Sequence, residues 1–435
     1  MAPGTSLLVF GNIKAFAAAR PGARPAAPPL ALIAAATAIG FCALHMVVPT
    51  LPILARVFDR GPAEVQLVLT LYFMGIAVGQ LVYGPVSDRF GRRPVLIAGL
   101  CLFLAGTALS GLAPTLPALI AGRIAQALGA CAGLVLGRAI IRDFYDRDAS
   151  ARGIALVMMT MTLAPAVSPA IGAYVTEWFG WRAMFVLLAA SGAGVLAWTL
   201  ARLAETHTET VPLNPVAIVR SHAVLLRSRA FMCFALCTAF TSASWFTFIA
   251  SAPYLLSETL REPPRTYGLM ILLPMTAYIL GNGAAARLAG RVGTGAMIVG
   301  GVALSLGSGM LMAAWCVYPG LSPWTLFVPM ALSSMGNGLS QPTAMASALS
   351  VYPRIAGTAS GLVGFAQMAV SALGTLAVAI LPHESPAAMV GVVVATQVIA
   401  FILGAVAVRL PALADSGVRG AASLATNDQA QGGSI

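Results

Sequence analysis

The chain has 435 residues, of which 59% are hydrophobic and only 9% are charged, and its formal net charge is +11 at pH 7. Soluble domains carry about 25% charged residues, so this chain lacks the polar side chains that a water-facing surface needs. The composition excludes an ordinary soluble protein and indicates a polytopic membrane protein. No basic patch with interleaved aromatic residues is present, so we expect no nucleic-acid partner and attribute the positive charge to membrane orientation.

The six cysteines all lie in apolar segments. None has His or carboxylate companions at the spacing of a metal site, and buried free cysteines behave as small apolar residues. We therefore predict no metal centre, no cofactor and no disulfide framework.

The chain begins with residues 1–28, which contain Lys14, Arg20 and Arg24 in a run rich in proline and alanine. The short apolar piece before these charges has the wrong order and length for a signal peptide. We predict a disordered cytoplasmic tail, and the true translation start stays open.

Apolar segments follow one another along the rest of the chain, each close to the ~20 residues that a membrane-crossing helix needs. The longest polar interval, 204–229, divides them into two groups of six. We predict an all-α membrane protein with a six-helix bundle at 29–203, a cytoplasmic linker at 204–229, a second six-helix bundle at 230–409 and a disordered cytoplasmic tail at 410–435. The predicted spans are 30–54, 65–84, 94–112, 117–141, 153–176, 182–203, 230–256, 266–286, 294–316, 322–346, 356–381 and 387–409.

A dense charge cluster, Gly84–Arg93 (G-P-V-S-D-R-F-G-R-R), follows the second span. Charges are costly in hydrocarbon, so we expect a short loop at a membrane face, with Gly84 allowing close approach of another helix. A looser copy without the aspartate, Gly283–Gly293, falls between the eighth and ninth spans. It predicts two related halves, and a chance basic loop is the alternative explanation.

Loop charges predict the orientation of the chain. With the N-terminus in the cytoplasm, 19 Lys and Arg residues lie on the cytoplasmic side and 5 lie outside. We therefore expect both termini in the cytoplasm. The remaining arginine, Arg123, lies within the fourth span, where we expect it to face a cavity or, alternatively, to extend to the interface.

Two of these motifs resemble those of major facilitator transporters. Gly84–Arg93 matches the pattern G-x-x-x-D-R-x-G-R-R of the loop between helices 2 and 3 in that superfamily. Arg123–Ala127 (R-I-A-Q-A) resembles its R-x-x-Q-G motif, with alanine in place of glycine.

The fifth span indicates which branch of this superfamily the chain resembles. It contains Pro165, Pro169 and Gly172, an altered form of the motif that marks exporters and antiporters, and prolines soften a membrane helix. Together with Gly180-Trp181-Arg182 and Arg138–Asp143, this variant is similar to the Bcr/CflA drug-resistance branch.

The resemblance implies the major facilitator fold, with twelve transmembrane helices in two six-helix bundles around a central cavity, in the bacterial inner membrane and as a monomer. It also implies that Asp88 lies near the amino-terminal end of helix 11, where a carboxylate is favoured. Such a latch would stabilise the outward-open state, whereas a plain positively charged anchor is the alternative. The implied latch residues are Gly84, Asp88, Arg89, Gly91, Arg92 and Arg93.

The first span departs from this branch, which typically has D-M-Y-L-P-x-L-P. Here the segment reads H-M-V-V-P-T-L-P, so His45 replaces the membrane-embedded acid, and every Asp and Glu falls in a loop, tail or helix end. At 1.5 Å per residue, His45 and Arg123 lie at nearly the same depth of a ~30 Å core. His45 is interpreted as a proton carrier, as a neutral hydrogen-bonding ligand for the substrate or as a packing residue.

Other polar residues are candidates for the cavity wall, although each could bond a neighbouring helix instead. They are Gln126, Trp245, Asn337, Gln341 and Gln367.

The sequence contains no ATP-binding loop and no nucleophile–base pair, so we do not expect an enzyme. We predict a proton-driven exporter of small molecules that works by alternating access. Neutral, phenicol-like substrates are favoured over cations, because the cavity has Arg123 and no acid. The alternatives are an uncoupled facilitator or organic-anion transporter, and a transport-dead membrane sensor or scaffold.

Overall fold

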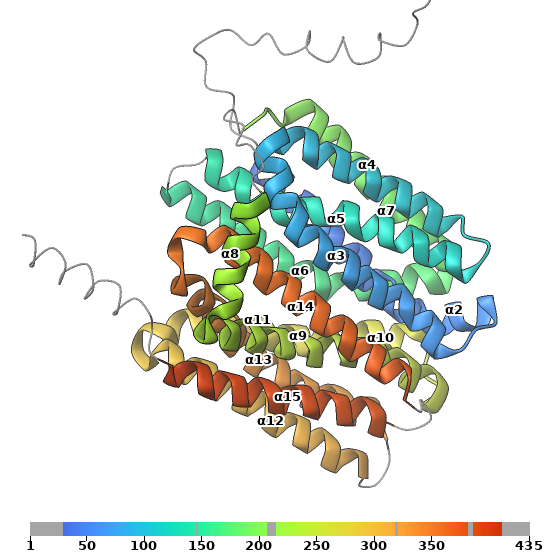
Figure 1. Ribbon diagram of the computed structural model, residues 1–435. Helices are drawn as coiled ribbons and strands as arrows, with labels where there is room; N and C mark the ends of the chain where they lie inside the picture. The colour runs from blue at the N-terminus through green and yellow to red at the C-terminus, as the bar shows by residue number, and fades with distance from the viewer. Residues whose placement is uncertain (1–28, 145–146, 207–214, 318–320, 382–385, 411–435) are drawn as a thin grey trace, which may run out of the picture.

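The computed structural model describes residues 29–144, 147–206, 215–317, 321–381 and 386–410. Within these ranges the chain consists of helices and short connections, without a β-strand (Figure 1). The all-α class predicted from the sequence is therefore confirmed for the described residues. The two predicted tails lie almost wholly outside them.

The first half of the molecule is organised around α5, which packs against α1, α3 and α4. α6 packs on α1, and α7 packs on α4. The helices of this half are α1 (Leu30–Met46), α2 (Leu51–Phe58), α3 (Pro62–Phe90), α4 (Arg92–Gly111), α5 (Leu116–Phe144), α6 (Arg147–Phe179) and α7 (Trp181–Arg202).

The second half is organised around α9 and α13, which pack against each other. α11 and α12 pack on α13, while α14 and α15 pack on α9. The remaining helices are α8 (Pro215–Arg227) between the halves, then α9 (Arg229–Tyr254), α10 (Pro264–Met270), α11 (Leu272–Val292), α12 (Thr294–Val317), α13 (Pro323–Val351), α14 (Ala356–Ala379) and α15 (Ala387–Arg409).

Ten helical segments among the described residues are long and apolar enough to cross a membrane. α6 and α13, with 33 and 29 residues, are long enough but are not among the ten. In α13 the serine, asparagine, glutamine and threonine side chains lower the hydropathy below that of the ten segments. The predicted count of twelve membrane helices thus stays a prediction.

The helices run side by side, so the molecule has two ends (Figure 1). We call the end with α8 and the α3–α4 and α11–α12 connections the arginine end, because it carries Arg89–Arg93 and Arg287–Arg291. The opposite, far end carries α2, the start of α10 and the α6–α7 connection.

The predicted loop at Gly84–Arg93 is mostly helical, which corrects the sequence-based boundary. α3 continues to Phe90 and α4 begins at Arg92, since polar residues beyond the hydrocarbon do not interrupt a helix. Only Gly91 connects the two, with φ 92°, a conformation that favours glycine. Gly293, with φ 87°, connects α11 and α12 in the same way, which supports two related halves.

The first membrane segment is interrupted one residue after His45. α1 ends at Met46, a 3₁₀ turn covers Val48–Thr50, and α2 continues the segment. Pro49 lacks the N–H that would continue the α-helical hydrogen bonds, so the backbone tightens here. The interruption lies at the level where the two halves meet.

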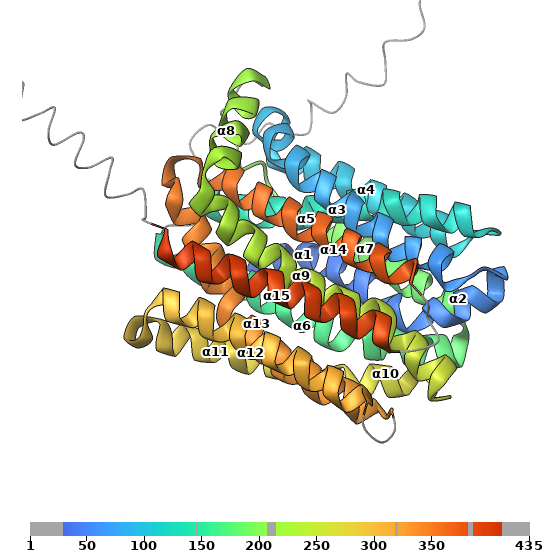
Figure 2. The same ribbon diagram turned by 60° about the horizontal axis from the view of Figure 1, so that its bottom comes forward.

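The halves contact each other along two seams (Figure 2). α3 lies along α14, and α6 packs against α10 and the beginning of α11. The first seam runs along much of both helices, whereas the second lies at the far end.

Candidate functional site

Arg123 forms a buried polar centre inside the first half. The residue has 0% exposure. One Nη donates to the carbonyl oxygen of Ala43 in α1 (2.9 Å) and to the Gln126 side-chain oxygen, and the guanidinium lies 4.0 Å from the ring centroid of Tyr72. These contacts offset part of the free-energy cost of burying the charge. Arg123 therefore points into the helix bundle in this conformation. The sequence had led us to expect that it faces an open cavity.

Residues from α3 and α4 hold this centre in place. The Gln126 amide donates to the Thr107 hydroxyl (2.8 Å), and the Tyr72 hydroxyl donates to the carbonyl oxygen of Gly40 (3.0 Å). Gln126 and Thr107 are themselves fully buried. Four helices, α1, α3, α4 and α5, thus fix one guanidinium, while its Nε and second Nη have no hydrogen-bond partner.

His45 lies beside this centre, at the seam between the halves. It follows Ala43, the acceptor for Arg123, by two residues, so the Arg123 guanidinium meets α1 close to the level of His45. Its Nδ1 is 2.9 Å from the carbonyl oxygen of Phe41, a geometry in which Nδ1–H donates and Nε2 is a free acceptor. Nε2 is buried without a partner, and the ring lies 6.2 Å from that of Phe246 in α9.

The proline-containing helix α6 presses against α1 next to His45. Pro165 and Pro169 lie inside α6, and both are buried. A Cβ at Gly172 would collide with the carbonyl oxygen of Met46, so only glycine permits this contact. Gly172 of the fifth-span motif is therefore brought to the helix that carries His45.

The second half contains neutral polar clusters. Gln341 in α13 accepts from the Tyr278 hydroxyl of α11 (3.0 Å) and donates to the Ser242 hydroxyl of α9 (2.7 Å). Asn337, one turn earlier, is 4% exposed and accepts from the Ser305 hydroxyl of α12 (2.7 Å). Asn337 thus bonds a neighbouring helix, which was the alternative to a place in the cavity wall.

The other two predicted cavity residues are half-buried. The Trp245 ring lies 6.3 Å from that of Phe248 in the same helix. The backbone carbonyl of Gln367 in α14 accepts from the Ser371 hydroxyl (2.6 Å). Neither side chain has a hydrogen bond to the described residues of the cluster at Gln341 or of the one at Arg123.

Arg92 is the centre of a charge cluster at the arginine end. It is 4% exposed, and its Nε is 2.9 Å from the carboxylate of Asp143 at the end of α5. Its Nη1 binds the carboxylate of Asp88 and the hydroxyl of Ser87. Arg93 donates to the carbonyl oxygen of Leu200 in α7 (3.2 Å). These contacts all stay within the first half.

Glu205, which sequence reasoning did not assign to the site, completes this cluster. Its carboxylate accepts from the backbone N–H groups of Arg92 (2.9 Å) and Arg93 (3.2 Å), the first residues of α4. A carboxylate at a helix N-terminus is favourable because the free N–H groups and the helix dipole are positive there. A Cβ at Gly91 would collide with this carboxylate, so glycine also makes room for it.

Among the described residues, the predicted contacts of the latch with helix 11, which is α14 in this structure, are absent from this conformation. No atom lies within 4 Å of the position that a Cβ would take at Gly84, so no helix approaches closely there. Asp88 pairs with Arg92, and Arg89 lies near the Phe90 ring at 5.5 Å. α14 instead approaches α3 at Gln80, whose side chain occupies the space beside Gly364.

The far ends of the two halves are joined by direct contacts. The Thr70 and Thr375 hydroxyls, from α3 and α14, are 2.9 Å apart. Arg265 at the start of α10 is 3.3 Å from the carboxylate of Glu177 at the end of α6. The rings of Phe73 and Phe246 lie 4.6 Å apart. The molecule is therefore closed at the far end.

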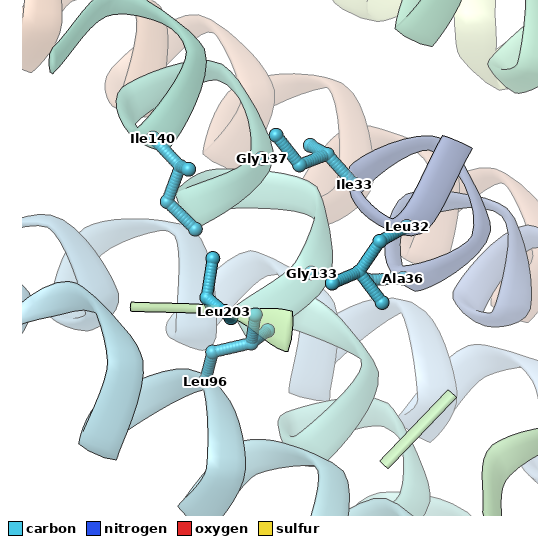
Figure 3. Close-up of a pocket in the computed structure, with 8 residues that line it drawn as sticks. All are labelled: Leu32, Ile33, Ala36, Leu96, Gly133, Gly137, Ile140 and Leu203. Atoms are coloured by element: carbon cyan, nitrogen blue, oxygen red, sulfur yellow. The ribbon is translucent and has the colours of Figure 1, made fainter. Parts of the chain in front are cut away.

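A small void in the first half lies apart from all these clusters. Its volume is about 10 Å³, which is room for roughly one water molecule. Figure 3 shows that its lining is apolar, so it is a packing defect and not a substrate site. The lining residues are Leu32, Ile33, Ala36, Leu96, Gly133, Gly137, Ile140 and Leu203.

Solved structures show which class of protein has this fold. The chain aligns with a bacterial homolog of the human lysosomal transporter Spinster, in an inward-facing and unoccupied conformation, with a TM-score of 0.68, covering 87% of this chain and 96% of that one at 14% identity. It aligns with a D-xylose–proton symporter with a TM-score of 0.67, covering 87% and 95% at 16% identity. The fold is therefore that of membrane transporters.

The sequence itself identifies the family. Residues 33–375 and 234–427 match the Major Facilitator Superfamily. The chain belongs to this superfamily.

Sequence relatives agree with the Bcr/CflA resemblance. Multidrug resistance protein D of Escherichia coli K12 is 31% identical over 336 residues, covering 77% of this chain and 84% of that protein. A bicyclomycin resistance protein homolog of Haemophilus influenzae is 27% identical, covering 82% and 91%. A chloramphenicol resistance protein of Pseudomonas aeruginosa is 29% identical, covering 79% and 81%. The predicted membership of this drug-resistance branch is confirmed.

Proposed function

We propose that the protein exports small drug-like molecules across the bacterial inner membrane by alternating access, in exchange for protons. The similarity to three named resistance proteins, over 77%, 82% and 79% of this chain, carries the proposal. In this proposal the chain acts as a monomer with twelve membrane helices, in two bundles at 29–203 and 230–409. The arginine end, with both termini, faces the cytoplasm because short cytoplasmic loops carry the excess of basic residues.

His45 is the proposed proton carrier. An imidazole can take up and release a proton, the His45 Nε2 has no partner, and the ring lies where Phe246 of the other half covers it. Rocking of the halves would uncover Nε2 first to one side of the membrane and then to the other. The break at Pro49 and the soft helix α6 lie directly beside it and would accommodate this movement.

Neutral substrates are proposed because the described residues place no carboxylate near His45 or Arg123 that could pair with a lipophilic cation. The cluster of Gln341, Tyr278 and Ser242 offers neutral donors and acceptors on the opposite half. Such groups suit the hydroxyl and amide groups of a phenicol.

The latch is proposed to act in the other conformation. With the far end closed, Asp88 binds Arg92. When the far end opens, the arginine ends of the halves would come together, and Asp88 would lie near the beginning of α14. The residues of this latch are Gly84, Asp88, Arg89, Gly91, Arg92 and Arg93.

Proton movement in proteoliposomes tests the proposal. Liposomes with an internal pH dye and an imposed gradient receive chloramphenicol and then tetraphenylphosphonium, with wild type, His45→Ala and the matched control His222→Ala compared. We expect chloramphenicol to evoke proton flux in wild type and in His222→Ala but not in His45→Ala.

Other outcomes would favour the alternatives. Substrate movement without protons would contradict antiport and favour an uncoupled facilitator. Binding without flux would favour a sensor or scaffold.

A further inference from the structure

A second cavity lies at the far end, between the two halves. Its volume is about 380 Å³, within the range of sites for small organic molecules. The first half contributes Ile53 and Arg56 from α2, and the second half contributes Leu256, Arg261 and Tyr267, together with prolines from both halves. The proposed transport site contains none of these residues.

The wall of this cavity contains an unsatisfied polar group. Tyr267 is only 1% exposed, and its hydroxyl is buried without a hydrogen-bond partner. A buried hydroxyl without a partner costs about 1–3 kcal/mol. The hydroxyl has no accessible surface in this conformation, so a ligand that supplies an acceptor would remove this cost once the Tyr267 ring turns toward it. Ile53, Pro263 and Pro264, which are partly exposed in the lining, provide an apolar surface for the rest of the ligand.

The mouth of the cavity carries a net positive charge. Arg56 and Arg261 are exposed, and neither forms an ion pair with a described residue. Glu262, the acid beside them, accepts from the Thr266 hydroxyl (3.0 Å). The lining thus contains two guanidinium groups and one carboxylate that already has a donor, which favours an anion.

The backbone of Arg261 supports a functional role for this residue. Its φ of 57° lies in the left-handed region, which is unfavourable for a residue with a long side chain. The turn is fixed by backbone hydrogen bonds from Leu260 to Leu255 (3.0 Å) and from Glu262 to Leu256 (2.8 Å). Such strain persists where the surrounding structure requires it, and it often marks ligand sites.

We propose that this cavity binds a small organic anion with one apolar ring and one sulfonate or carboxylate group. The ring packs against Ile53, Pro263 and Pro264, an anionic oxygen accepts from the Tyr267 hydroxyl after its ring has turned, and Arg56 and Arg261 neutralise the charge. Because both halves form the walls, the occupant favours the conformation that is closed at this end. In the orientation given under the proposed function, on which this step rests, the site opens to the outside. Its occupant then inhibits export.

Binding to the full-length protein in lipid nanodiscs tests the site without requiring transport. Benzenesulfonate is the probe, and benzyltrimethylammonium, with the same ring and the opposite charge, is its control. Calorimetric titration compares wild type with Arg261→Gln and Tyr267→Phe. Arg60→Gln is the matched control, since Arg60 is an exposed arginine at the same end that pairs with Glu64 outside the cavity.

We expect benzenesulfonate to bind wild type and Arg60→Gln equally, and benzyltrimethylammonium not to bind. Arg261→Gln should weaken binding about tenfold and Tyr267→Phe about three- to tenfold, the loss expected for one hydrogen bond. Equal binding by all variants, or binding of the cation, would overturn the proposal. If Gln341→Ala weakens binding and Arg261→Gln does not, the anion binds at the central cluster. That result would also overturn the proposal.

The result is independent of whether the protein exports drugs. The predicted pattern of binding in a protein without drug-evoked flux would support the site and contradict the proposed function. Drug export together with unchanged benzenesulfonate binding in Arg261→Gln and Tyr267→Phe would support the proposed function and contradict the site.

Discussion

The two halves differ in the polar groups that they bury. The first half encloses a charge, the Arg123 guanidinium, held by a backbone carbonyl, an amide oxygen and an aromatic face, with His45 beside it. The second half encloses neutral networks around Asn337 and Gln341. Buried charges are costly and are retained where function needs them. In the proposed mechanism, the first half accordingly handles charge movement and the second half handles neutral recognition.

The α3–α4 and α11–α12 connections at the arginine end also differ in their ion pairs. Gly91 and Gly293 have almost the same backbone conformation, but only the first is surrounded by carboxylates, from Asp88, Asp143 and Glu205. Arg287 and Arg291, before Gly293, form no ion pair with the described residues. The two connections thus share a backbone conformation, but among the described residues only the one at Gly91 has an electrostatic clamp, which we define as the contacts of Asp88, Asp143 and Glu205 with Arg92.

Removing the buried charge should have the largest effect. Arg123→Met leaves the Gln126 oxygen and the Ala43 carbonyl without this donor, and a charge-assisted hydrogen bond contributes about 1.5–3 kcal/mol, or roughly tenfold or more in transport. Asn337→Ala removes a neutral bond and should lower transport about threefold. Chloramphenicol uptake into inverted vesicles, at equal amounts of folded protein, measures both. A larger loss in Asn337→Ala than in Arg123→Met would contradict the assignment of charge to the first half.

Restoring an acid beside Arg123 should change the substrate preference. His45→Asp places a carboxylate at the seam, so we expect the ratio of tetraphenylphosphonium to chloramphenicol transport to rise about tenfold, equivalent to ~1.4 kcal/mol. Gln341→Glu introduces the same charge into the second half and should change this ratio less. Uptake of both compounds by each variant gives the ratio. An unchanged ratio in His45→Asp would show that substrates do not reach this position.

The clamp at Gly91 should contribute moderately to stability. Glu205→Gln removes a charge from the N-terminus of α4, so we expect the free energy of unfolding to fall by about 1 kcal/mol, and by less at high salt. Arg291→Gln, exposed at the equivalent connection, should change it by less than about 0.5 kcal/mol. Thermal unfolding in micelles at low and high salt compares them. Equal shifts in the two variants would remove the proposed asymmetry.

Contacts between the halves at the far end should have the smallest effect. Thr70→Val removes a buried hydrogen bond and should shift the conformational equilibrium by about 1 kcal/mol, whereas Glu177→Gln breaks an exposed ion pair worth about 0–1 kcal/mol. A cysteine at position 173, where Ala173 is fully buried, reports opening by its rate of alkylation, followed by mass spectrometry. Faster labelling in Glu177→Gln than in Thr70→Val would reverse this order.

The sequence predicted the helices well because hydropathy and charge are local properties. The apolar segments, the polar interval near 204–229 and the arginine-rich loop all follow from neighbouring residues. The end of α3 was placed too early, at residue 84, since a helix that leaves the hydrocarbon need not stop there.

Partners of the polar residues could not be predicted, because they come from other helices. Nothing near Arg123 in sequence indicates that Tyr72 and the Ala43 carbonyl meet it. Glu205 is more than a hundred residues from Arg92, and its position at a helix end was the only available signal. Asn337 and Gln341 lie on one helix, and helical spacing does not say whether such residues face a cavity or a neighbour.

The polar character of α13 has a consequence for biogenesis. A segment of low hydropathy enters the bilayer poorly on its own. Its hydrogen-bond partners lie in α9, α11, α12 and α15, and Gln397 of α15 donates to Ser333 of α13 (2.9 Å) only once the last of these helices has been synthesised. This bond therefore forms only after α15 has been made, so chains truncated before α15 should hold α13 less firmly in the membrane.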